Sequence, residues 1–384
     1  MSRTVLWLTP EKSGGIRSYS EDLFQTLARE RSGNFEFKKI FTDRITTASH
    51  IKVIVDGILD IRPDLIHIQH EFSLFGSKVP GRYLFPKFVR ELRRKVPGVP
   101  LVATAHTVLD SQYLYPWRGR GWQMPIRWLA NHSVVPHFRK AWLQGSWGNL
   151  DAVIVHSELQ RDTIFAGGCS RAQVIPHYIP NLQGKYSGMH PVLESIPQDA
   201  PVILLFGFFS KDKGQDLAIQ AFAKLRKDAH LILAGGPRRG EEKRYYLACR
   251  KRVKDLGLES RVSITGFVSS GQMYGIFSRS NLVLCPFRET FGSGSLAQAF
   301  AMNAVVLASD LPLNLEVECR EPGCLSFFKS ESVEDCARKL DELLMNAEVA
   351  TRQRVAVEKY AKKYSLKKTA TAHVDFYREL LGDA

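Results

Sequence analysis

The chain has 384 residues, of which 44% are hydrophobic and 24% are charged, and its formal net charge at pH 7 is +14. This length predicts two domains, and the ordinary share of charged residues excludes a wholly disordered chain. No apolar run approaches the roughly 20 residues of a membrane span. The short apolar stretch near the N-terminus is followed by charge, so we expect a first strand there and no signal peptide.

The distribution of charge and the use of cysteine bear on the cellular compartment and on the kind of binding partner. Residues 1–190 hold 25 Lys and Arg against 15 Asp and Glu, whereas the remainder holds 28 against 24. The basic first half favours an anionic partner such as nucleic acid, lipid headgroups or a phosphorylated substrate, although a basic soluble surface fits equally well. The six cysteines lack metal-like spacing, and Cys285 lies in an apolar strand pattern. We therefore expect a reducing, cytoplasmic setting and a core position for Cys285.

Short apolar runs alternate with helical patterns along the chain. In the helical pattern at 14–30, for example, Ile16, Tyr19, Leu23 and Leu27 fall on one stripe. Continuous apolar runs are typical of parallel strands buried on both faces, so the alternation predicts doubly wound α/β sheets. Strands are expected at 4–10, 65–70, 101–106, 152–157 and 173–178, and then at 201–208, 230–236, 261–267, 281–287 and 304–310.

The two series of strands are separated by residues 180–201, which are rich in Pro, Gly and Ser and show no periodicity. We interpret this stretch as a linker between two Rossmann-like domains that face each other across a deep cleft. The predicted boundaries are 1–183 for the first domain and 184–361 for the second. Ligands of open α/β sheets bind outside the C-terminal ends of the strands, so the chemistry is expected in the strand-to-helix turns.

Turns of the first half carry several candidates. Gly14 and Gly15 open a helix whose N–H groups could hold an anion, but a plain tight turn fits as well. The pair is not G-x-G-x-x-G, and no acid ends the second strand at the expected spacing, which argues against a nicotinamide dinucleotide. His106 follows a strand and could hydrogen-bond a substrate hydroxyl, whereas a packed or solvated histidine fits equally. The same two interpretations apply to His70, Glu71 and His177.

Turns of the second half suit a phosphate and a sugar. Gly207 allows close approach of a ligand, and Lys213 stands just before a helix, where a cation can meet a phosphate. The stretch "PFRETFGSGSLAQAF" places Glu289 before a glycine- and serine-rich helix start. The N–H groups of that helix start could hold a pyrophosphate, while Glu289 could accept hydrogen bonds from sugar hydroxyls. An exposed loop acid is the alternative for Glu289.

In combination these motifs resemble the GT-B glycosyltransferases, specifically the retaining enzymes of glycosyltransferase family 4. The matching stretches are "SGGIRSYSEDL", "QHEFSLFG", "TAHTVL", "VHS", "VIPHYIP", "FGFFSKDKG", "ITGFV" and "RETFGSGSLAQAFAMNAVVLASD", in the family's order over nearly the whole chain. The C-terminal segment at about 362–384 looks like the helix that crosses back to the first domain. The resemblance implies an acceptor-binding first domain and a donor-binding second domain.

The resemblance also implies roles for single residues. Gly15 approaches the donor phosphate, His106 the donor sugar, and Lys213 the pyrophosphate. Glu289 binds sugar hydroxyls, and the catalytic residues are His106, Glu289 and Lys213. No metal site and no cofactor besides the nucleotide-sugar donor are implied. The donor-binding residues are Gly15, Gly207, Phe208, Lys211, Phe267, Val268, Phe291, Gly292, Ser293, Gly294, Ser295 and Gln298.

Two positions depart from the family's pattern. The family usually has an arginine just after the glycine matched by Gly207, but here the residue is Phe208, and Lys211 is a candidate to compensate. The family's second glutamate, which binds the ribose, falls on Ala297, with Gln298 beside it. The full set of phosphate contacts and the selectivity for base and ribose are therefore open.

The leading hypothesis is a metal-independent, retaining hexosyltransferase that moves a sugar from a UDP-sugar to a hydroxyl of a glycan or lipid-linked acceptor. UDP-glucose ranks before UDP-galactose, UDP-N-acetylglucosamine and GDP-mannose. A role in polysaccharide assembly fits such acceptors. The alternatives are a GT-B-fold sugar-nucleotide epimerase or hydrolase, and a non-catalytic nucleic-acid-binding protein. The scattered cations and the lack of an aromatic-interleaved RNA motif argue against nucleic acid.

A helix expected at 86–98 bears on the acceptor. Phe88, Val89 and Leu92 form its apolar face, and the cations Arg90, Arg93, Arg94 and Lys95 form the other. Such a helix could bind an anionic membrane through residues 86–95 and place the protein at the inner face of the plasma membrane. An ordinary surface helix of a cytoplasmic protein is the alternative.

Overall fold

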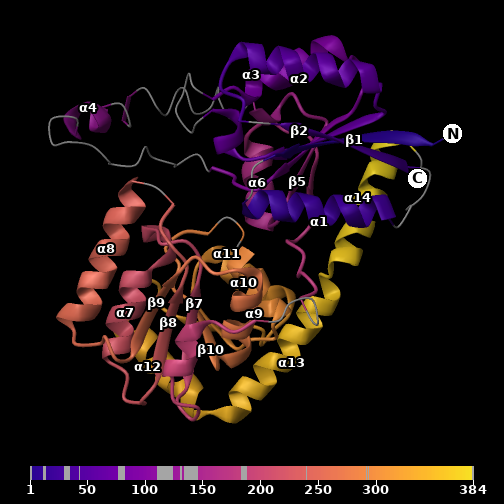
Figure 1. Ribbon diagram of the computed structural model, residues 1–384. Helices are drawn as coiled ribbons and strands as arrows, with labels where there is room; N and C mark the ends of the chain where they lie inside the picture. The colour runs from indigo at the N-terminus through magenta and orange to yellow at the C-terminus, as the bar shows by residue number, and fades with distance from the viewer. Residues whose placement is uncertain are drawn as a thin grey trace. The chain divides into compact units, whose positions relative to one another are not determined.

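The computed structural model describes residues 2–11, 14–29, 35–42, 44–76, 83–109, 124–129, 132–133, 146–182, 188–238, 240–290, 292 and 294–382. The chain divides into two compact units (Figure 1). The N-terminal unit comprises Met1–Pro176 and Leu366–Ala384, and the C-terminal unit comprises His177–Ser365. The boundaries inferred from the sequence were 183/184 and about 361/362. The predicted cleft between the two domains stays a prediction.

The N-terminal unit contains a parallel six-stranded sheet in the order β2-β1-β3-β4-β5-β6. Every residue of β3, β4 and β5 is buried, which is why these strands read as continuous apolar runs. The strands are β1 (Arg3–Pro10), β2 (Phe35–Thr42), β3 (Leu65–His70), β4 (Leu101–Ala105), β5 (Ala152–Val155) and β6 (Ala172–Val174). The helices are α1 (Gly15–Arg29), α2 (Ala48–Ile61), η1 (Phe72–Phe75), α3 (Phe85–Lys95), α4 (Met124–Leu129), α6 (Glu158–Ala166) and α14 (Leu366–Leu381).

Side-chain caps and apolar stripes position the helices of this unit. Thr47 caps α2 and Ser157 caps α6, each by accepting a bond from a backbone N–H of the first turn. Helix α1 buries Tyr19, Leu23 and Leu27, as its sequence pattern predicted. The C-terminal helix α14 lies against α1 (Figure 1). The end of the chain is thus part of the N-terminal unit.

Helix α3 corrects one interpretation made from the sequence. Phe88, Val89 and Leu92 have no exposed surface, because the apolar face of this helix packs into the core of the N-terminal unit. Two of its cations are paired, Arg93 with Asp151 and Arg94 with Glu91. The apolar face is therefore not available to enter a membrane. An electrostatic contact through the exposed cations stays a prediction.

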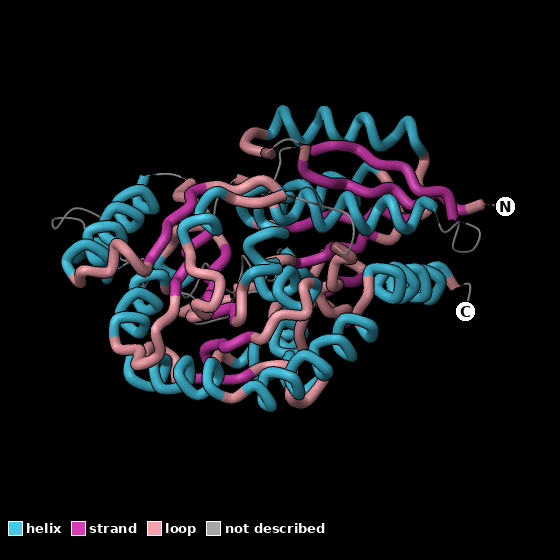
Figure 2. Tube along the Cα trace, turned by 60° about the horizontal axis from the view of Figure 1, so that its bottom comes forward, coloured by secondary structure: helices cyan, strands magenta, loops and turns pink. Residues whose placement is uncertain are grey.

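The C-terminal unit contains a second parallel six-stranded sheet, in the order β12-β11-β10-β7-β8-β9, flanked by helices (Figure 2). The strands are β7 (Val202–Phe206), β8 (His230–Ala234), β9 (Val262–Gly266), β10 (Leu282–Cys285), β11 (Val306–Ser309) and β12 (Ser326–Phe328). The helices are η4 (Pro191–Ser195), η5 (Lys211–Lys213), α7 (Gln215–Ala223), α8 (Gly240–Asp255), α9 (Ser270–Arg279), α10 (Gly294–Ala301), α11 (Pro312–Arg320), α12 (Val333–Met345) and α13 (Ala347–Lys363). Both units confirm the predicted α/β class.

The strand order of the C-terminal sheet indicates where a ligand can bind. The first strand of this unit, β7, has β8 on one side and β10 on the other, so the chain reverses direction across the sheet between β7 and β10. At such a switch point the loops that follow the two strands diverge and leave a crevice at the C-terminal edge. The loops after β7 and β10 contain most of the donor-site residues predicted from the sequence.

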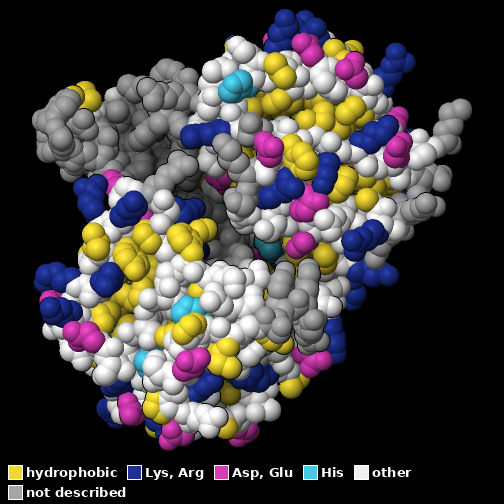
Figure 3. Space-filling view, in the orientation of Figure 1, with side chains coloured by type: hydrophobic (Ala, Val, Ile, Leu, Met, Phe, Trp, Pro, Cys, Tyr) yellow, Lys and Arg dark blue, Asp and Glu magenta, His cyan; other side chains and the backbone are white. Residues whose placement is uncertain are grey.

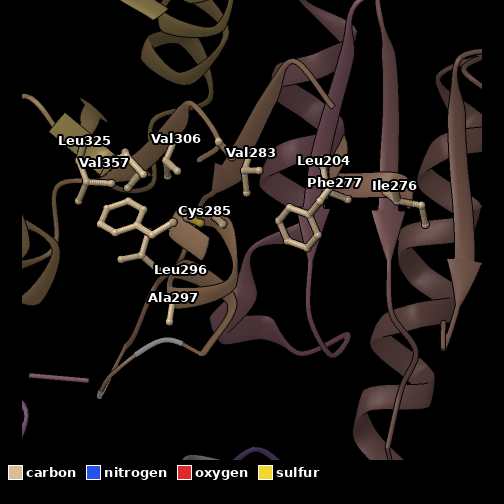
Figure 4. Close-up of a cluster of buried hydrophobic side chains, with 14 of the residues drawn as sticks. Leu204, Ile276, Phe277, Val283, Cys285, Leu296, Ala297, Val306, Leu325 and Val357 are labelled. Carbon is tan, nitrogen blue, oxygen red and sulfur yellow. The ribbon is translucent and has the colours of Figure 1, made fainter. Parts of the chain in front are cut away.

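The apolar core of the C-terminal unit packs against the residues that flank these loops. Cys285, at the end of β10, is 2% exposed and packs in a cluster with Val283, Leu296 and Phe300 (Figure 4). This confirms its predicted core position. The cluster joins α10 to the sheet, so the helix that begins at the candidate site is fixed along its length. A second cluster packs α7, α8 and α12 on the sheet.

Part of the predicted linker is packed rather than free. Of its described residues, Ile196 belongs to the core of the C-terminal unit, and a Cβ on Gly188 would lie 2.8 Å from the backbone of Gly271. All six cysteines lie in the described part of the chain, and none forms a disulfide. Among the described residues, no helix has the length and apolar content to span a membrane.

Candidate functional site

Glycines allow three loops of the C-terminal unit to meet at the switch point. Gly214, between η5 and α7, has φ 70°, and a Cβ there would lie 2.0 Å from the carbonyl oxygen of Pro286. A Cβ on Gly235, after β8, would lie 1.9 Å from the carbonyl oxygen of Gly207. Neither position tolerates a side chain, so these glycines bring the loops after β7, β8 and β10 together.

Lys213 lies among these loops as a desolvated cation. Its Nζ lies 4.0 Å from the centroid of the Phe287 ring, which follows β10. Burial of the ammonium lowers the pKa of Lys213. Among the described residues, no carboxylate forms an ion pair with this Nζ. A buried cation without a carboxylate partner is costly to the fold and is suited to an incoming anion.

The start of α10 approaches the same loops. A Cβ on Gly207 would lie 3.2 Å from the Ser295 Oγ, so the first turn of α10 lies beside the end of β7. The first N–H groups of a helix lack intrahelical partners and favour an anion. Gly292, just before the helix, has φ 124°, a value that favours glycine. Gly294 has no atom within 4 Å of a Cβ built on it, and Phe291 and Ser293 lie outside the described residues.

Arg288 connects the loop of Glu289 to the loop of Lys213. Its guanidinium donates to both carboxylate oxygens of Asp216 in α7, at 2.7 and 3.2 Å, and to the carbonyl oxygen of Lys211. Its backbone N–H donates to the carbonyl oxygen of Asp212 at 2.8 Å. Burial alone would raise the pKa of Asp216, but hydrogen bonds from Arg288 and Tyr245 outweigh it and leave the pKa lowered. The two loops are thus held in one arrangement.

Glu289 itself is exposed and, among the described residues, has no hydrogen-bond or ion-pair partner. The anchored Arg288 precedes it, so its backbone is fixed while its carboxylate remains available. A carboxylate with this placement can accept hydrogen bonds from a ligand. The role of Glu289 toward a sugar stays a prediction.

Two aromatic side chains lie at the same sheet edge, after β7 and β9. Phe208 is 39% exposed and Phe267 is 63% exposed, and their ring centroids are 6.1 Å apart in an edge-to-face arrangement. A Cβ on Gly236 would lie 2.8 Å from the Phe267 ring, so this ring covers the loop after β8. Exposed rings of this kind offer a stacking surface for a planar ligand group. Val268 follows, half-buried against the core.

Ala297, which stands where the family has its second glutamate, belongs to the apolar core. Ala297 is 5% exposed and packs in the apolar cluster under the loops (Figure 4). The amide oxygen of the neighbouring Gln298 is buried and makes no hydrogen bond with the described residues. Lys211 is exposed, and its backbone oxygen is held by Arg288.

In the N-terminal unit, His106 follows β4 and is oriented by Gln69 of β3. The His106 Nε2 donates to the Gln69 Oε1 at 2.8 Å, because a carbonyl oxygen can only accept. The Gln69 amide nitrogen donates in turn to the His67 Nε2 at 3.1 Å. With Nε2 accepting, the His67 Nδ1 carries the proton and donates to the Tyr377 hydroxyl of α14. Burial lowers the pKa of His67 well below its ordinary value, so its ring is neutral.

This relay fixes the proton of His106 on Nε2. The ring also packs edge-to-face on Tyr19 of α1, with centroids 4.9 Å apart, and lies near His156 after β5. Gly14 and Gly15 open α1, and both are exposed with no atom within 4 Å of a Cβ. Packing does not require these glycines, although the φ of 157° at Gly14 favours glycine. The approach of Gly15 to a ligand stays a prediction.

The remaining candidates, His70 and Glu71 of the N-terminal unit and His177 of the C-terminal unit, make contacts within the protein. His70 has no exposed surface, its Nε2 contacts the Tyr83 hydroxyl at 2.6 Å, and burial lowers its pKa to about 3. Glu71 caps η1 by accepting from the Phe72 N–H and also accepts from the Thr107 hydroxyl. The His177 Nδ1 contacts the carbonyl oxygen of Tyr178, and burial lowers the pKa of its imidazole.

Comparison with known proteins relates the chain to one family. Residues 192–364, which lie within the C-terminal unit, match the sequence profile of the glycosyl transferases group 1 family. The chain is 28% identical to the alpha-D-kanosaminyltransferase of Streptomyces kanamyceticus over 311 residues, which cover 76% of this chain and 74% of the relative. It is 24% identical to the D-inositol 3-phosphate glycosyltransferase of Mycobacterium tuberculosis over 350 residues, which cover 89% and 68%.

Solved structures place the chain in the GT-B fold. The sucrose-phosphate synthase of Thermosynechococcus elongatus superposes with a TM-score of 0.74 at 15% identity over 100% of both chains. HepE of Anabaena, in complex with UDP and glucose, superposes with a TM-score of 0.70 at 15% identity over 98% of this chain and 100% of HepE. At these identities the likeness concerns the fold alone. The predicted GT-B class is thus confirmed.

Proposed function

We propose that the protein transfers a hexosyl group from a UDP-sugar, with UDP-glucose as the first donor to test, to a hydroxyl of a glycan or lipid-linked acceptor. The C-terminal unit binds the donor and the N-terminal unit binds the acceptor. The match of residues 192–364 to the glycosyl transferases group 1 family supports the reaction class. The solved HepE complex with UDP-glucose and the sucrose-phosphate synthase supply the reason for testing UDP-glucose first.

Lys213 is the observation that carries this proposal. Its half-buried side chain lies at the switch point of the C-terminal sheet, and its ammonium lacks a carboxylate partner among the described residues. The first turn of α10 lies beside Gly207, at the end of β7. A nucleoside diphosphate supplies the negative charge that both features favour.

The proposed reaction proceeds with retention of configuration. The bond between the anomeric carbon and the diphosphate oxygen breaks, and UDP leaves. The acceptor hydroxyl attacks the anomeric carbon on the same face, and its proton passes to a phosphate oxygen of the departing UDP. Lys213 and the N–H groups of α10 stabilise the charge that develops on the leaving group. Glu289 holds the hydroxyls of the hexose, and His106 approaches the donor sugar. The orientation of the His106 ring is fixed by the bond that its Nε2 donates to Gln69.

Metal independence and a place in polysaccharide assembly complete the proposal. Both derive from the family resemblance. Among the described residues, no group of three or more His, Cys, Asp or Glu side chains could hold a metal ion. Activity that survives exhaustive treatment with a chelator would agree with metal independence, whereas loss of activity that Mg²⁺ restores would contradict it.

The proposal is tested by incubating the protein with UDP-glucose and following UDP release with and without candidate acceptors. Stimulation of UDP release by an acceptor, together with an α-linked product, supports a retaining transferase. Release of free sugar, or a changed sugar nucleotide without any acceptor, supports the hydrolase or epimerase instead. A thermal-shift panel of nucleotide sugars, run first, identifies the donor, because specific binding stabilises the folded state.

A further inference from the structure

Arg238 lies at the candidate donor site although it belongs to none of the family's motifs. It follows β8 in the loop that leads to α8. Backbone hydrogen bonds join this loop to the loop after β7: the Gly207 N–H donates to the Ala234 oxygen at 3.0 Å, and the Phe209 N–H donates to the Gly236 oxygen at 3.1 Å. The two loops therefore hold Arg238 and Phe208 side by side.

The guanidinium of Arg238 is oriented by two contacts. Its central carbon lies 4.4 Å from the centroid of the Phe208 ring. Its Nη2 donates to the Glu242 Oε1 at 2.8 Å, and its backbone N–H donates to the Glu242 Oε2 at 2.6 Å. No hydrogen bond joins its Nη1 to a described residue, and the side chain is 55% exposed. Phe208 and Glu242 thus fix the guanidinium, while its Nη1 can still donate a hydrogen bond to a ligand.

Arg238 and Lys213 belong to loops that meet at the C-terminal edge of the sheet. A Cβ on Gly235, in the loop of Arg238, would lie 1.9 Å from the carbonyl oxygen of Gly207, which begins the loop of Lys213. Burial is the first cause of the lowered pKa of Lys213, and the charge of Arg238 acts in the same direction. In the space-filling view, Lys and Arg side chains lie beside hydrophobic ones over α8 of this unit (Figure 3).

We propose that Arg238 contacts the diphosphate of the nucleotide donor and replaces, from the loop after β8, the arginine that the family pattern has at position 208. This inference rests on the proposed function, because it takes the donor to be a nucleoside diphosphate sugar. Phe208 provides the ring on which the guanidinium lies. Lys211, the substitute considered from the sequence, is exposed, and only its backbone oxygen is held in place.

The test compares the binding of UDP and of uridine by calorimetry. Arg238→Ala should weaken UDP binding by about ten- to a hundredfold, the range for a charge-assisted hydrogen bond. Uridine binding should stay within about twofold, because uridine carries no phosphate. The matched control is Arg244→Ala in the following helix, α8, whose guanidinium pairs with Glu241 and whose side chain is 80% exposed. This control should leave UDP binding unchanged.

A second variant tests whether Arg238 takes over the role of the family's arginine at position 208 or only lies near the diphosphate. Phe208→Arg, introduced into Arg238→Ala, should recover most of the lost UDP affinity, since it restores a cation at the position of the family's arginine. Unchanged UDP binding in Arg238→Ala overturns the inference, and so does an equal loss of uridine binding. A wild-type protein that binds neither UDP nor UDP-glucose instead overturns the proposed function. Thermal unfolding of each variant verifies that it is folded.

Discussion

The ammonium of Lys213 lies 4.0 Å from the centroid of the Phe287 ring, with no carboxylate of the described residues paired to it. The loops after β7 and β10 create this arrangement, and Gly214 allows them to approach each other. A cation–π contact offsets only part of the cost of burying an ammonium. Replacing Lys213 should therefore affect ligand binding and not the stability of the fold.

Lys213→Met is the first test of this expectation. We expect the free energy of unfolding to fall by no more than about 0.5 kcal/mol, because the substitution removes an unpaired buried charge. UDP binding should be weakened by about 1.5–3 kcal/mol in the same variant, because the diphosphate loses its bond to the ammonium. Chemical unfolding and calorimetry measure the two quantities. A loss of more than about 2 kcal/mol of stability would make Lys213 a structural residue.

The pH dependence of UDP binding tests the protonation state of Lys213. Its lowered pKa means that the free protein loses this proton at a lower pH than an ordinary lysine does. UDP affinity should therefore be constant near neutral pH and fall as the pH rises toward this pKa. Lys213→Arg stays charged and should lack the fall. Taking the difference between the two proteins removes the titration of the nucleotide itself, and identical pH profiles would contradict the assignment.

Buried histidines predict a loss of stability in acid. Burial lowers the pKa of His70 to about 3 and that of His373 to about 4, against about 6.5 in the unfolded chain. Above pH 6.5 neither state binds these protons, so their contribution to stability is constant there. Below pH 6.5 only the unfolded chain binds them, so each histidine lowers the free energy of unfolding by about 1.4 kcal/mol per pH unit until its folded pKa is reached.

The measurement is urea unfolding of the N-terminal unit between pH 7.5 and 5. His373→Gln should have a shallower dependence on pH than the wild type, whatever its stability at pH 7.5. His50→Gln changes an exposed histidine and serves as the control. If the curves of His373→Gln and the wild type are parallel, the account of the buried histidines is wrong.

Gln69 is expected to act on turnover through His106. Gln69→Met removes the acceptor for the His106 Nε2 and should lower kcat by about tenfold, because the ring loses its fixed orientation. UDP affinity should not change, since the diphosphate-binding loops belong to the other unit. Gln69→Glu keeps an acceptor oxygen and should retain more activity than Gln69→Met. Equal losses in kcat and in UDP affinity would indicate a general structural defect instead.

Glu289 should separate sugar binding from nucleotide binding. Glu289→Ala should leave UDP affinity within about threefold, because UDP carries no hexose, and lower turnover of the UDP-sugar by roughly a hundredfold or more. Glu289→Gln keeps one acceptor oxygen and should fall between. If Glu289 is an exposed acid that binds no ligand, its replacement should change neither UDP affinity nor turnover. The free energy of unfolding should then change by under about 0.5 kcal/mol. Near-wild-type turnover in Glu289→Ala would contradict the assignment.

The central strands could be predicted from the sequence, whereas two of the four edge strands could not. Strands such as β4 and β7 are buried on both faces and therefore read as short apolar runs. β2 and β12 escaped prediction, and each lies at the end of its sheet. β2 pairs on one side only and carries Lys38 and Lys39, so its pattern resembles a surface segment. Helix α3 could be predicted, but membrane binding and an ordinary surface helix stayed open, because the sequence does not say which surface covers its apolar face.

Residues of the candidate site could be predicted from the sequence only where they belong to a short motif. Lys213 and Gly207 stand in one such turn, and Glu289 stands in another. Arg238 and Gln69 could not be predicted, because their contact partners are distant in the sequence. The contact of Arg238 with Phe208 needs the loops after β7 and β8 to be adjacent, and the relay from Gln69 needs the register that places Gln69 beside Thr104. Strand order and register supply these contacts.

The central claim is that Lys213 and the loops around it hold a nucleoside diphosphate, and a calorimetric titration of UDP into the wild type and Lys213→Ala tests it most directly. The account predicts that the wild type binds UDP and that the substitution weakens binding by about 1.5–3 kcal/mol, the range for a hydrogen bond to a charged group. Equal affinities in the two proteins, with both folded, would contradict it.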